Sequence, residues 1–240
     1  MNKEKLLDEN SKHALQSDNI IAITNRHLCS RPFMEQLERV CKLHPHAIVL
    51  REKDMPEAEY LSLARDVIAL CKKYDVQCML HSFINVAMEL EHPYIHLPLP
   101  ILEAYVKKNV SGNISTGMSK STDNYQQFFK VIGTSVHSVE DAIKAEQLGA
   151  TYMTAGHIFA TDCKKGLPPR GLDFLKNVCD AVGIPVYAIG GINIASNYNS
   201  TASDSPSTYD AVRDISVPRL AEVMECGAAG GCIMSGMMRV

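Results

Sequence analysis

The residues best suited to chemistry lie in one long loop, residues 156–171. The loop follows a short apolar run that predicts a buried strand, and a helical pattern begins directly after it. Between its glycines it carries one hydroxyl and several cations, among them Thr161, Lys164, Lys165 and Arg170. Unhindered backbone N–H groups, a hydroxyl and mobile ammonium groups together suit the binding of an anion. The loop alone leaves a solvated basic segment open as the alternative.

The chain around this loop alternates short apolar runs with amphipathic helical patterns. The apolar runs predict strands at residues 20–24, 47–50, 77–80, 94–97, 131–133, 152–155, 186–189 and 231–234. The helical patterns between them fall at residues 34–43, 57–74, 84–89, 139–148, 172–182 and 217–226. Eight such units in 240 residues favour an α/β (β/α)8 TIM barrel over an open doubly wound sheet.

Three segments do not follow the repeat. The last predicted strand lies close to Val240, so we expect the eighth helix to be truncated or missing. Residues 195–216 are rich in Ser, Asn, Thr and Asp, which indicates an inserted loop after the seventh strand. Residues 1–18 are polar and form an N-terminal segment that could cover the flank left by the eighth helix. The prediction is therefore a single TIM-barrel domain over residues 1–240.

A barrel of this kind carries its chemistry at the C-terminal ends of its strands. The residues that follow the predicted strands share titratable or hydrogen-bonding side chains, or glycine. They are Arg51, Glu52, Lys53, His81, Ser82, His96, Ser135, His137, Gly190, Gly191, Ser235 and Gly236. So many titratable groups at one end of the strands point to a ligand rather than to a structural role.

Three of these groups suggest specific chemistry. The pairs 190–191 and 235–236 follow the seventh and eighth strands, where barrels commonly bind phosphate, although Gly-Gly also makes a plain tight turn. His137 could carry a proton between substrate atoms, because histidine titrates near neutrality. Arg51 and Lys53 could bind a carboxylate or phosphate, or could pair with Glu52 as a solvated cluster.

Composition excludes several other functions. A formal charge of −3 gives no electrostatic reason to bind nucleic acid or an anionic membrane. No apolar run reaches the roughly 18 residues that span a bilayer, and the polar N-terminus is no signal peptide, so we expect a cytoplasmic protein. The eight cysteines form no Cys-x-x-Cys pair, which predicts reduced thiols and no zinc site. Cys163 lies within the charged loop, but no neighbouring residue marks it as a nucleophile.

Four blocks together resemble the thiamin phosphate synthase superfamily over roughly residues 20–238. They are residues 48–53 (Ile-Val-Leu-Arg-Glu-Lys), 133–137 (Gly-Thr-Ser-Val-His), 188–192 (Ala-Ile-Gly-Gly-Ile) and the loop 156–171. The resemblance allows two activities. The synthase joins a pyrimidine diphosphate to a thiazole phosphate with magnesium, whereas the thiazole tautomerase (TenI-type) branch rearranges a carboxythiazole phosphate.

Two departures from the family pattern favour the tautomerase branch. The synthase holds magnesium with aspartates after strands three and four, but this chain has His-Ser-Phe-Ile-Asn at 81–85 and His-Leu-Pro-Leu-Pro at 96–100. Magnesium needs oxygen ligands, so the missing aspartates argue against diphosphate chemistry. The loop 156–171 and residues 135–138 look like the tautomerase branch. The resemblance therefore predicts an isomerase with no metal and no cofactor.

The resemblance also implies roles for the candidate residues. His137 would act as general base and then general acid, and Glu52 would orient or relay the second proton. The phosphate would be held by Gly190, Gly191, Ser235 and Gly236. The rest of the substrate would contact Arg51, Lys53, His81, Ser135, Thr161 and Lys164. The expected partner is a small-molecule thiazole phosphate, with no nucleic acid and no membrane. A homodimer is one arrangement that the sequence allows.

Three alternatives stay open. The chain could be a divergent synthase in which other oxygens hold magnesium, which predicts metal-dependent release of pyrophosphate. It could instead be a non-catalytic protein that keeps the phosphate pocket and binds thiamin-pathway metabolites without turnover. A third alternative is another phosphate-binding barrel isomerase, because glycines at the strand ends are common in such folds.

Overall fold

Eight parallel strands close into a barrel in the order β1 to β8, with β8 pairing β1. The coordinates are a computed structural model that describes residues 19–112, 128–161, 164, 166–195 and 217–240. Each strand pairs with the next one along the chain, as in a (β/α)8 TIM barrel. The strands are β1 Ile20–Ile23, β2 Ala47–Leu50, β3 Gln77–His81, β4 Tyr94–Pro98, β5 Val131–Val136, β6 Tyr152–Gly156, β7 Val186–Ile189 and β8 Gly230–Ile233.

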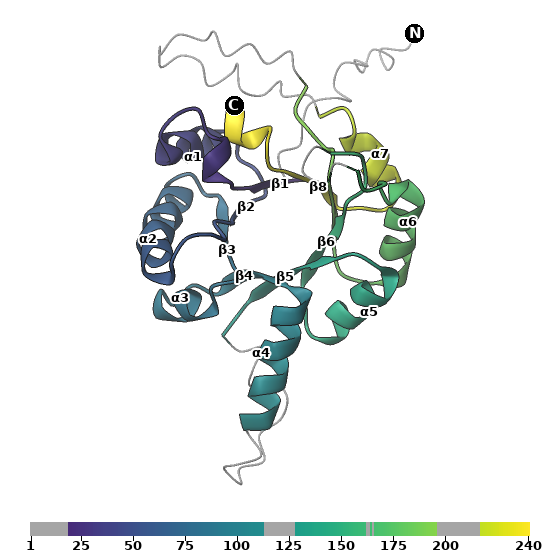
Figure 1. Cartoon of the computed structure of the whole chain (residues 1–240), viewed down its shortest axis with the longest axis horizontal. Coiled ribbons are helices and arrows are strands. Elements are labelled where there is room, and N and C mark those ends of the chain that lie inside the picture. Colours follow the sequence, from purple (N-terminus) through teal and green to yellow (C-terminus); the bar gives the residue numbers. More distant parts are fainter. Residues whose placement is uncertain (1–18, 113–127, 162–163, 165, 196–216) are drawn as a thin grey trace, which may run out of the picture.

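Helices surround the barrel (Figure 1). They are α1 Phe33–Lys42, α2 Glu57–Lys73, α3 Ile84–Glu89, α4 Leu99–Gly112, α5 Val139–Gln147, α6 Gly171–Ala181 and α7 Leu220–Glu225, with the short 3₁₀ helices η3 Arg26–Leu28 and η6 Met237–Arg239. The predicted barrel and its eight strands are confirmed, whereas α4 is a helix that the sequence patterns did not predict. Helix α5 begins at a side-chain cap, because Ser138 Oγ accepts a hydrogen bond of 3.0 Å from the Asp141 N–H.

The strands are apolar on both faces because each face packs against a different core. Alternate residues point outward into a continuous layer between strands and helices, which contains Ile48, Leu50 and Met153. The residues between them point into the barrel and form a smaller interior cluster, which contains Val49, Met79 and Tyr187. This arrangement explains why the strands appear in the sequence as unbroken hydrophobic runs.

The chain after β8 packs against α1 (Figure 1). Here the 3₁₀ helix η6 follows β8, and Met237 and Met238 are buried. The side chain of Gln36 on α1, which is fully buried, donates to the Met237 carbonyl oxygen at 2.7 Å and to that of Val240 at 3.1 Å. The predicted N-terminal segment, and the 195–216 insertion apart from Ala195, lie outside the described residues.

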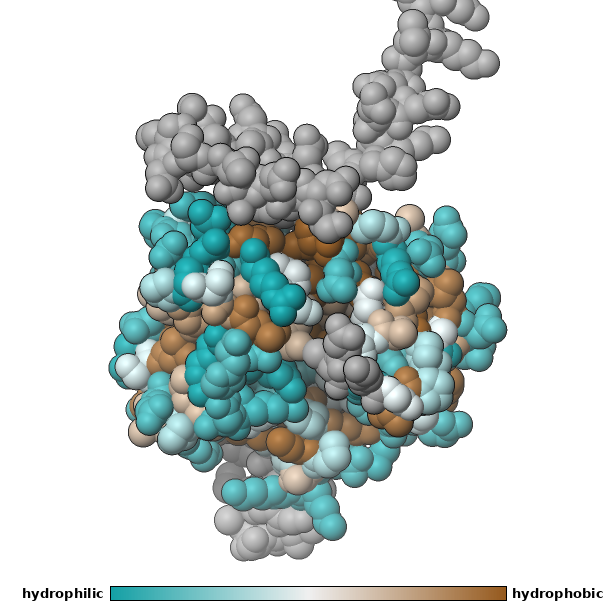
Figure 2. Space-filling view, turned by 45° about the horizontal axis from the view of Figure 1, so that its top comes forward, coloured by the Kyte–Doolittle hydropathy of each residue, from teal (hydrophilic) through white to brown (hydrophobic). Residues whose placement is uncertain are grey.

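The surface of the described part is mixed in character. In Figure 2 hydrophilic residues cover much of the visible face, with smaller hydrophobic areas between them. Large hydrophobic side chains that are exposed belong to separate elements, for example Met88 on α3 and Ile143 on α5. Within the ranges that the structure describes, no helix is long and apolar enough to cross a membrane.

Candidate functional site

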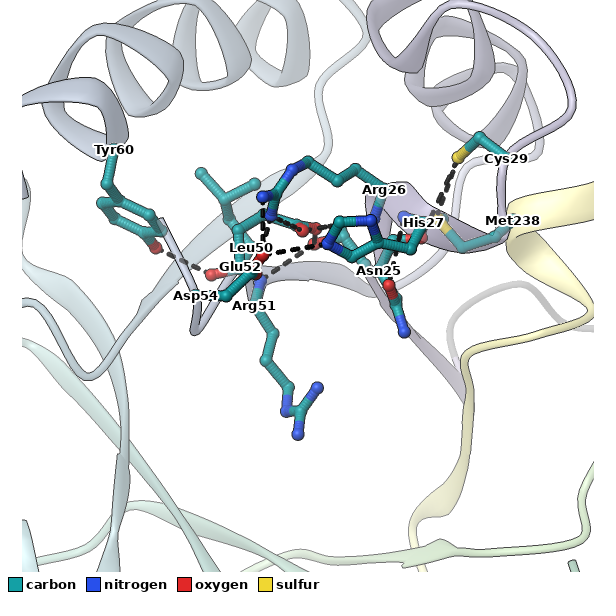
Figure 3. Close-up of polar contacts among 11 residues, drawn as sticks. Asn25, Arg26, His27, Cys29, Leu50, Arg51, Glu52, Asp54, Tyr60 and Met238 are labelled. Atoms are coloured by element: carbon teal, nitrogen blue, oxygen red, sulfur yellow. Dashed lines mark hydrogen bonds and ion pairs between the residues drawn. The ribbon is translucent and has the colours of Figure 1, made fainter. Parts of the chain in front are cut away.

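Two cations follow β2 at the C-terminal end of the barrel, which we call the rim. The Arg51 N–H donates to Thr24 Oγ1 at 2.8 Å, which fixes the backbone where the strand ends. The Arg51 side chain then extends away from this contact toward the barrel interior (Figure 3). Lys53 is exposed, and desolvation followed by the charge of Arg51 lowers its pKa. The sequence left two roles open for these cations, pairing with Glu52 as a solvated cluster or binding a carboxylate or phosphate, and the second stays a prediction.

Glu52, between the two cations, points into the protein instead. Glu52 is 2% exposed, and its carboxylate accepts a hydrogen bond of 2.6 Å from Thr24 Oγ1. The same carboxylate accepts the Arg26 N–H at 3.1 Å and Arg26 Nη1 at 3.0 Å, so β1 and β2 are tied together where they end (Figure 3). A carboxylate with these partners has little capacity left for a substrate proton. The arrangement favours a positioning role for Glu52 over the predicted acid–base role.

The same arginine binds a second carboxylate at the surface. Arg26 makes a bidentate contact with Asp54, at 2.8 and 2.7 Å, and His27 Nε2 lies 2.9 Å from the same carboxylate. These contacts hold the pKa of Asp54 well below its usual range, with the Arg26 hydrogen bond as the largest cause. The sequence did not predict this cluster, because the candidate residues follow strands two to eight, whereas residues 25–27 follow strand one.

Two stacked histidines lie beside the cations. The rings of His81, at the end of β3, and His96, on β4, have centroids 5.6 Å apart and planes 16° apart. Burial, the largest cause, acts together with the charges of Arg51 and Lys53 to lower the pKa of His81 to about 2 and that of His96 to about 3. Both imidazoles are therefore neutral near pH 7, so they can donate or accept hydrogen bonds without adding charge to the rim.

His81 is held by a tyrosine from the helix layer. Tyr60, on α2, donates its hydroxyl hydrogen to the Leu50 carbonyl oxygen at 2.7 Å and accepts the His81 N–H at 3.0 Å. One buried hydroxyl thus fixes the ends of β2 and β3 together. On its other side, His81 Nδ1 is 2.8 Å from the Ser82 hydroxyl oxygen.

A chain of hydrogen bonds crosses the barrel interior below the rim. His96 Nδ1 lies 2.9 Å from the Tyr152 hydroxyl oxygen, and its Nε2 lies 2.9 Å from Ser135 Oγ. Thr154 Oγ1 donates to Ser135 Oγ at 3.0 Å. Ser135 is half-buried, so its hydroxyl is the member of this chain closest to solvent. The sequence predicted Ser135 as a substrate contact, whereas His96 was predicted only to lie at the end of the fourth strand and Tyr152 only to lie within a strand.

His137 lies on another side of the rim. Its Nδ1 is 3.1 Å from the Gly156 carbonyl oxygen, which can only accept, so Nδ1 carries the hydrogen in this arrangement. In the neutral ring Nε2 is then the free acceptor, and the side chain is exposed. A Cβ built on Gly156 would lie 3.6 Å from His137 Cε1, so the ring rests over the end of β6. None of its hydrogen bonds within the described part of the chain joins it to Glu52, its predicted catalytic partner.

Gly190 and Gly191 allow a close approach between two loops. Both have positive φ, 104° and 70°, a region that favours glycine. A Cβ on Gly190 would lie 2.7 Å from His157 Cβ, and one on Gly191 would lie 2.6 Å from the Ala160 carbonyl oxygen. The glycines are therefore required for the end of β7 to pack on the start of the 156–171 loop, whatever they contribute to anion binding.

The remaining predicted residues lie on neighbouring loops. Gly236, after β8, approaches residues that follow β7, because its Cβ would lie 3.3 Å from the Ile194 N atom. Ser235 and Gly236 are half-buried, as are Thr161 and Lys164 in the 156–171 loop. The Lys164 N–H donates to the Thr161 carbonyl oxygen at 3.0 Å, which forms a turn there. Cys163 and Lys165 lie outside the described residues.

The described residues do not offer a magnesium site at the rim. They contain no group of three or more His, Cys, Asp or Glu side chains placed to hold a metal ion. The two carboxylates that follow β2, Glu52 and Asp54, are engaged by Arg26. Since magnesium prefers several oxygen ligands, the side chains present do not fit the ion that the family resemblance implies.

The fold defines a (β/α)8 barrel whose candidate site lies at the C-terminal ends of its strands. A family model described as thiamine monophosphate synthase matches residues 20–204. The chain therefore belongs to the thiamine monophosphate synthase family.

Individual relatives agree with this assignment. The chain is 35% identical over 173 residues to a putative thiamine-phosphate synthase 2 of Aquifex aeolicus, covering 72% of this chain and 84% of that protein. It is 29% identical to a thiamine-phosphate synthase of Caldanaerobacter subterraneus, covering 75% of this chain and 77% of the other. The solved thiamine phosphate pyrophosphorylase of Pyrococcus furiosus matches with a TM-score of 0.65 and 26% identity, over 92% and 88% of the two chains.

These relatives correct the functional prediction from sequence. The family resemblance predicted a member of the tautomerase branch, which is an isomerase. The relatives bear the name of a synthase, which is a transferase, so the isomerase assignment is wrong. The error came from weighting the missing aspartates and the 156–171 loop above the similarity of the chain as a whole.

Proposed function

We propose that this protein is a divergent thiamine-phosphate synthase that joins a pyrimidine diphosphate to a thiazole phosphate. The observation that carries the proposal is the name shared by relatives at 27–35% identity, most of which align with more than 70% of this chain. The two cations that follow β2, Arg51 and Lys53, give this reaction a physical basis.

The reaction needs positive charge at one place. The C–O bond between the pyrimidine methylene and the diphosphate breaks, and its electron pair leaves with pyrophosphate. The thiazole nitrogen supplies the pair that forms the new C–N bond, so no proton has to move. Negative charge therefore develops on the leaving oxygen, where fixed cations stabilise the transition state most. Arg51 and Lys53 are the chain's own groups that could supply this charge.

The neutral histidines beside these cations suit the proposed transfer reaction. Because His81 is uncharged near pH 7, its Nε2 can hydrogen-bond a polar heterocycle without repelling the thiazolium cation that forms. The neutral His96 ring, whose two nitrogens contact Tyr152 and Ser135, adds no positive charge beside it. Ser135, bonded to His96, presents a hydroxyl on the same side of the barrel. We assign the thiazole phosphate to the loops after β7 and β8, with Gly190, Gly191, Ser235 and Gly236 as its contacts and Lys164 as a further cation. No step of this mechanism is assigned to magnesium, because the described residues do not fit it.

The proposal is tested by mixing the purified protein with a pyrimidine diphosphate and a thiazole phosphate, with added Mg²⁺ or with EDTA. We expect pyrophosphate and thiamine phosphate to appear in equal amounts, measured by a coupled phosphate assay and by mass spectrometry. A parallel sample without the thiazole phosphate measures simple hydrolysis of the diphosphate. Absence of both products under both metal conditions would overturn the proposal.

A second candidate is a non-catalytic protein that binds thiamine-pathway phosphates. One observation favours it, namely that the rim carboxylates Glu52 and Asp54 are bound to Arg26 rather than free for a metal. This candidate predicts saturable binding of the thiazole phosphate by calorimetry, without release of pyrophosphate. Turnover in the assay above would exclude it.

A further inference from the structure

The barrel contains a cavity at its N-terminal end, on the side away from the rim. Its volume is about 220 Å³, and residues at the beginnings of the strands line it. The lining includes Ile21, Met79, Tyr152, Tyr187, Gln77 and His46. Side chains usually fill the interior of a (β/α)8 barrel in layers, so an open space of this size at one end is unusual.

The walls of the cavity suit a flat, uncharged molecule. The rings of Tyr152 and Tyr187 meet at 89° with centroids 6.0 Å apart, and His46 stacks on Tyr187 at 5.8 Å. A ring placed among them would find both aromatic faces and edges, an arrangement that aromatic groups prefer. Lysine, arginine, aspartate and glutamate are absent from its lining in the described part of the chain, so the lining favours an uncharged ligand over a charged one.

The volume of the cavity and the polar groups that line it restrict the class of ligand further. An apolar cavity of roughly 150 Å³ can hold benzene, whereas drug-sized ligands occupy about 300–1,000 Å³. The present volume therefore fits a single substituted ring. The hydroxyl of Tyr187, a residue that is 6% exposed, has no hydrogen-bond partner among the described residues, and Gln77 is half-buried at the same end. Both can bond a polar substituent.

One wall of the cavity is connected to the rim. The Tyr152 ring lies over Gly133, where an added Cβ would come within 2.1 Å of it, and its hydroxyl contacts His96 Nδ1. His96 in turn contacts Ser135, the half-buried hydroxyl at the rim. A displacement of Tyr152 by a ligand below would therefore change the hydrogen bonding of His96 above.

We propose that the N-terminal end of the barrel is a binding site for a small, uncharged, single-ring aromatic molecule. Binding there is transmitted to the rim through Tyr152, His96 and Ser135. The site goes beyond the proposed transferase activity and does not depend on it, so its tests use binding and spectroscopy rather than turnover.

The site is tested with phenol as the probe and methyl NMR of the methionines as the readout. Met79 lines the cavity, whereas Met153 is equally buried but points into the layer between strands and helices. We expect phenol to shift the Met79 signal in a saturable manner and to leave the Met153 signal nearly unchanged. A Met79 signal that does not move, or that moves in proportion to phenol without saturating, would overturn the site.

Two blocking variants check where phenol binds. Gln77→Trp should close the cavity at a partly exposed position, and Ala47→Leu should fill it from another lining position. Each should reduce the phenol-induced shift of Met79 at least tenfold. Gln147→Trp, the same change at an exposed site on α5, should leave the shift intact. A full shift in both folded blocking variants would overturn the assignment.

Two tyrosine variants test the connection. In Tyr152→Phe the ring stays but the contact with His96 is lost, whereas Tyr187→Phe removes a cavity hydroxyl that does not contact His96. Phenol should shift the ring ¹⁵N signals of His96 in the parent and in Tyr187→Phe, but not in Tyr152→Phe. If Met79 responds in the parent while His96 does not, the binding site stands and the connection to the rim is overturned.

Discussion

The two ends of the barrel differ in chemistry although the same strands build both. At the C-terminal end the interior positions carry Arg51, His81 and Ser135, and at the N-terminal end they carry Ile21 and Tyr187. All of these side chains face the interior because successive residues of a strand alternate between its two faces. The position of a residue along its strand determines at which end of the barrel it lies. The comparison shows that polar groups are kept together at one end, where the loops from strand to helix can complete a site.

The polar end also requires more support than the apolar end. The Tyr60 hydroxyl fixes the ends of β2 and β3, and the Glu52 carboxylate fixes those of β1 and β2. Such contacts satisfy buried polar groups that would otherwise destabilise the fold. The N-terminal end relies on packing of apolar and aromatic rings instead. Substitutions at the C-terminal end should therefore destabilise the protein through lost hydrogen bonds, and substitutions at the N-terminal end through altered packing.

The largest effect is expected from Arg51→Gln. Removing a cation that stabilises the leaving group should lower kcat of pyrophosphate release by roughly 10²–10³-fold, with little change in thermal stability. Arg65→Gln, an exposed arginine on α2, serves as the matched control and should keep full activity. Equal rates for Arg51→Gln and the control would show that the rim cations do not take part in the transfer.

The next effect is a loss of stability in mild acid. His81 and His96 have pKa values of about 2 and about 3 when folded, against about 6.5 when unfolded. Below pH 6.5 the unfolded chain therefore binds more protons, and stability falls as pH falls. Each histidine should remove about 2 kcal/mol between pH 6.5 and 5, measured by urea unfolding. His92, whose pKa burial also lowers, adds to the loss in the same direction.

The pH range from 6.5 to 5 separates the contribution of the histidines to stability from that of the carboxylates. The pKa values of Asp54 and Glu38 are held low, by Arg26 and Tyr74 respectively, so their contributions are lost only in stronger acid. A His81→Gln, His96→Gln double variant should have a much flatter profile between pH 6.5 and 5. A parent profile that is already flat over this range would contradict the neutral, buried state of the two rings.

The third prediction concerns Gly133, which lies in the barrel interior between the two ends. In Gly133→Ala the new methyl group would lie 2.1–2.3 Å from Tyr152 ring atoms, so the ring must move and its contact with His96 is lost. We expect a loss of about 3 kcal/mol in the free energy of unfolding. Gly183→Ala, where the nearest atom would be 3.5 Å away, is the control and should be neutral or slightly stabilising. Similar stabilities for both variants would show that Tyr152 can move without cost.

Much of the fold could be predicted from sequence because its pattern is local. Runs such as Ala47–Leu50 and Val186–Ile189 are apolar without interruption, as expected for strands buried on both faces, and the structure has the same bounds. Helix α4 was missed because Pro100 interrupts its first turn in the sequence, although proline is tolerated at that position.

The site could be predicted only in part, because its contacts join distant residues. The placement of Arg51 followed from the end of a strand, which sequence shows directly. The partners of Glu52 could not be predicted in this way. Arg26 lies 26 positions away, and its contact with Glu52 depends on how two strands end side by side. Likewise the Tyr152–His96 contact spans 56 positions, and nothing in either local pattern indicates it.

The smallest predicted effect compares two carboxylates that bind the same arginine. Glu52 is buried and Asp54 is 56% exposed, and both accept hydrogen bonds from Arg26. Glu52→Gln places an amide NH2 against N–H donors and should lower the free energy of unfolding by about 2 kcal/mol. Asp54→Asn should cost much less, and only its cost should shrink in high salt, because water and ions screen an exposed pair.

Urea unfolding at low and high salt measures both changes, and an Asp54→Asn loss as large as that of Glu52→Gln would contradict the comparison. The Glu52→Gln variant also decides between two roles for this carboxylate. A positioning residue should leave the rate of pyrophosphate release per folded molecule nearly unchanged at temperatures where the variant is folded. An acid–base residue would lower that rate by roughly 10²-fold or more without the matching loss of stability.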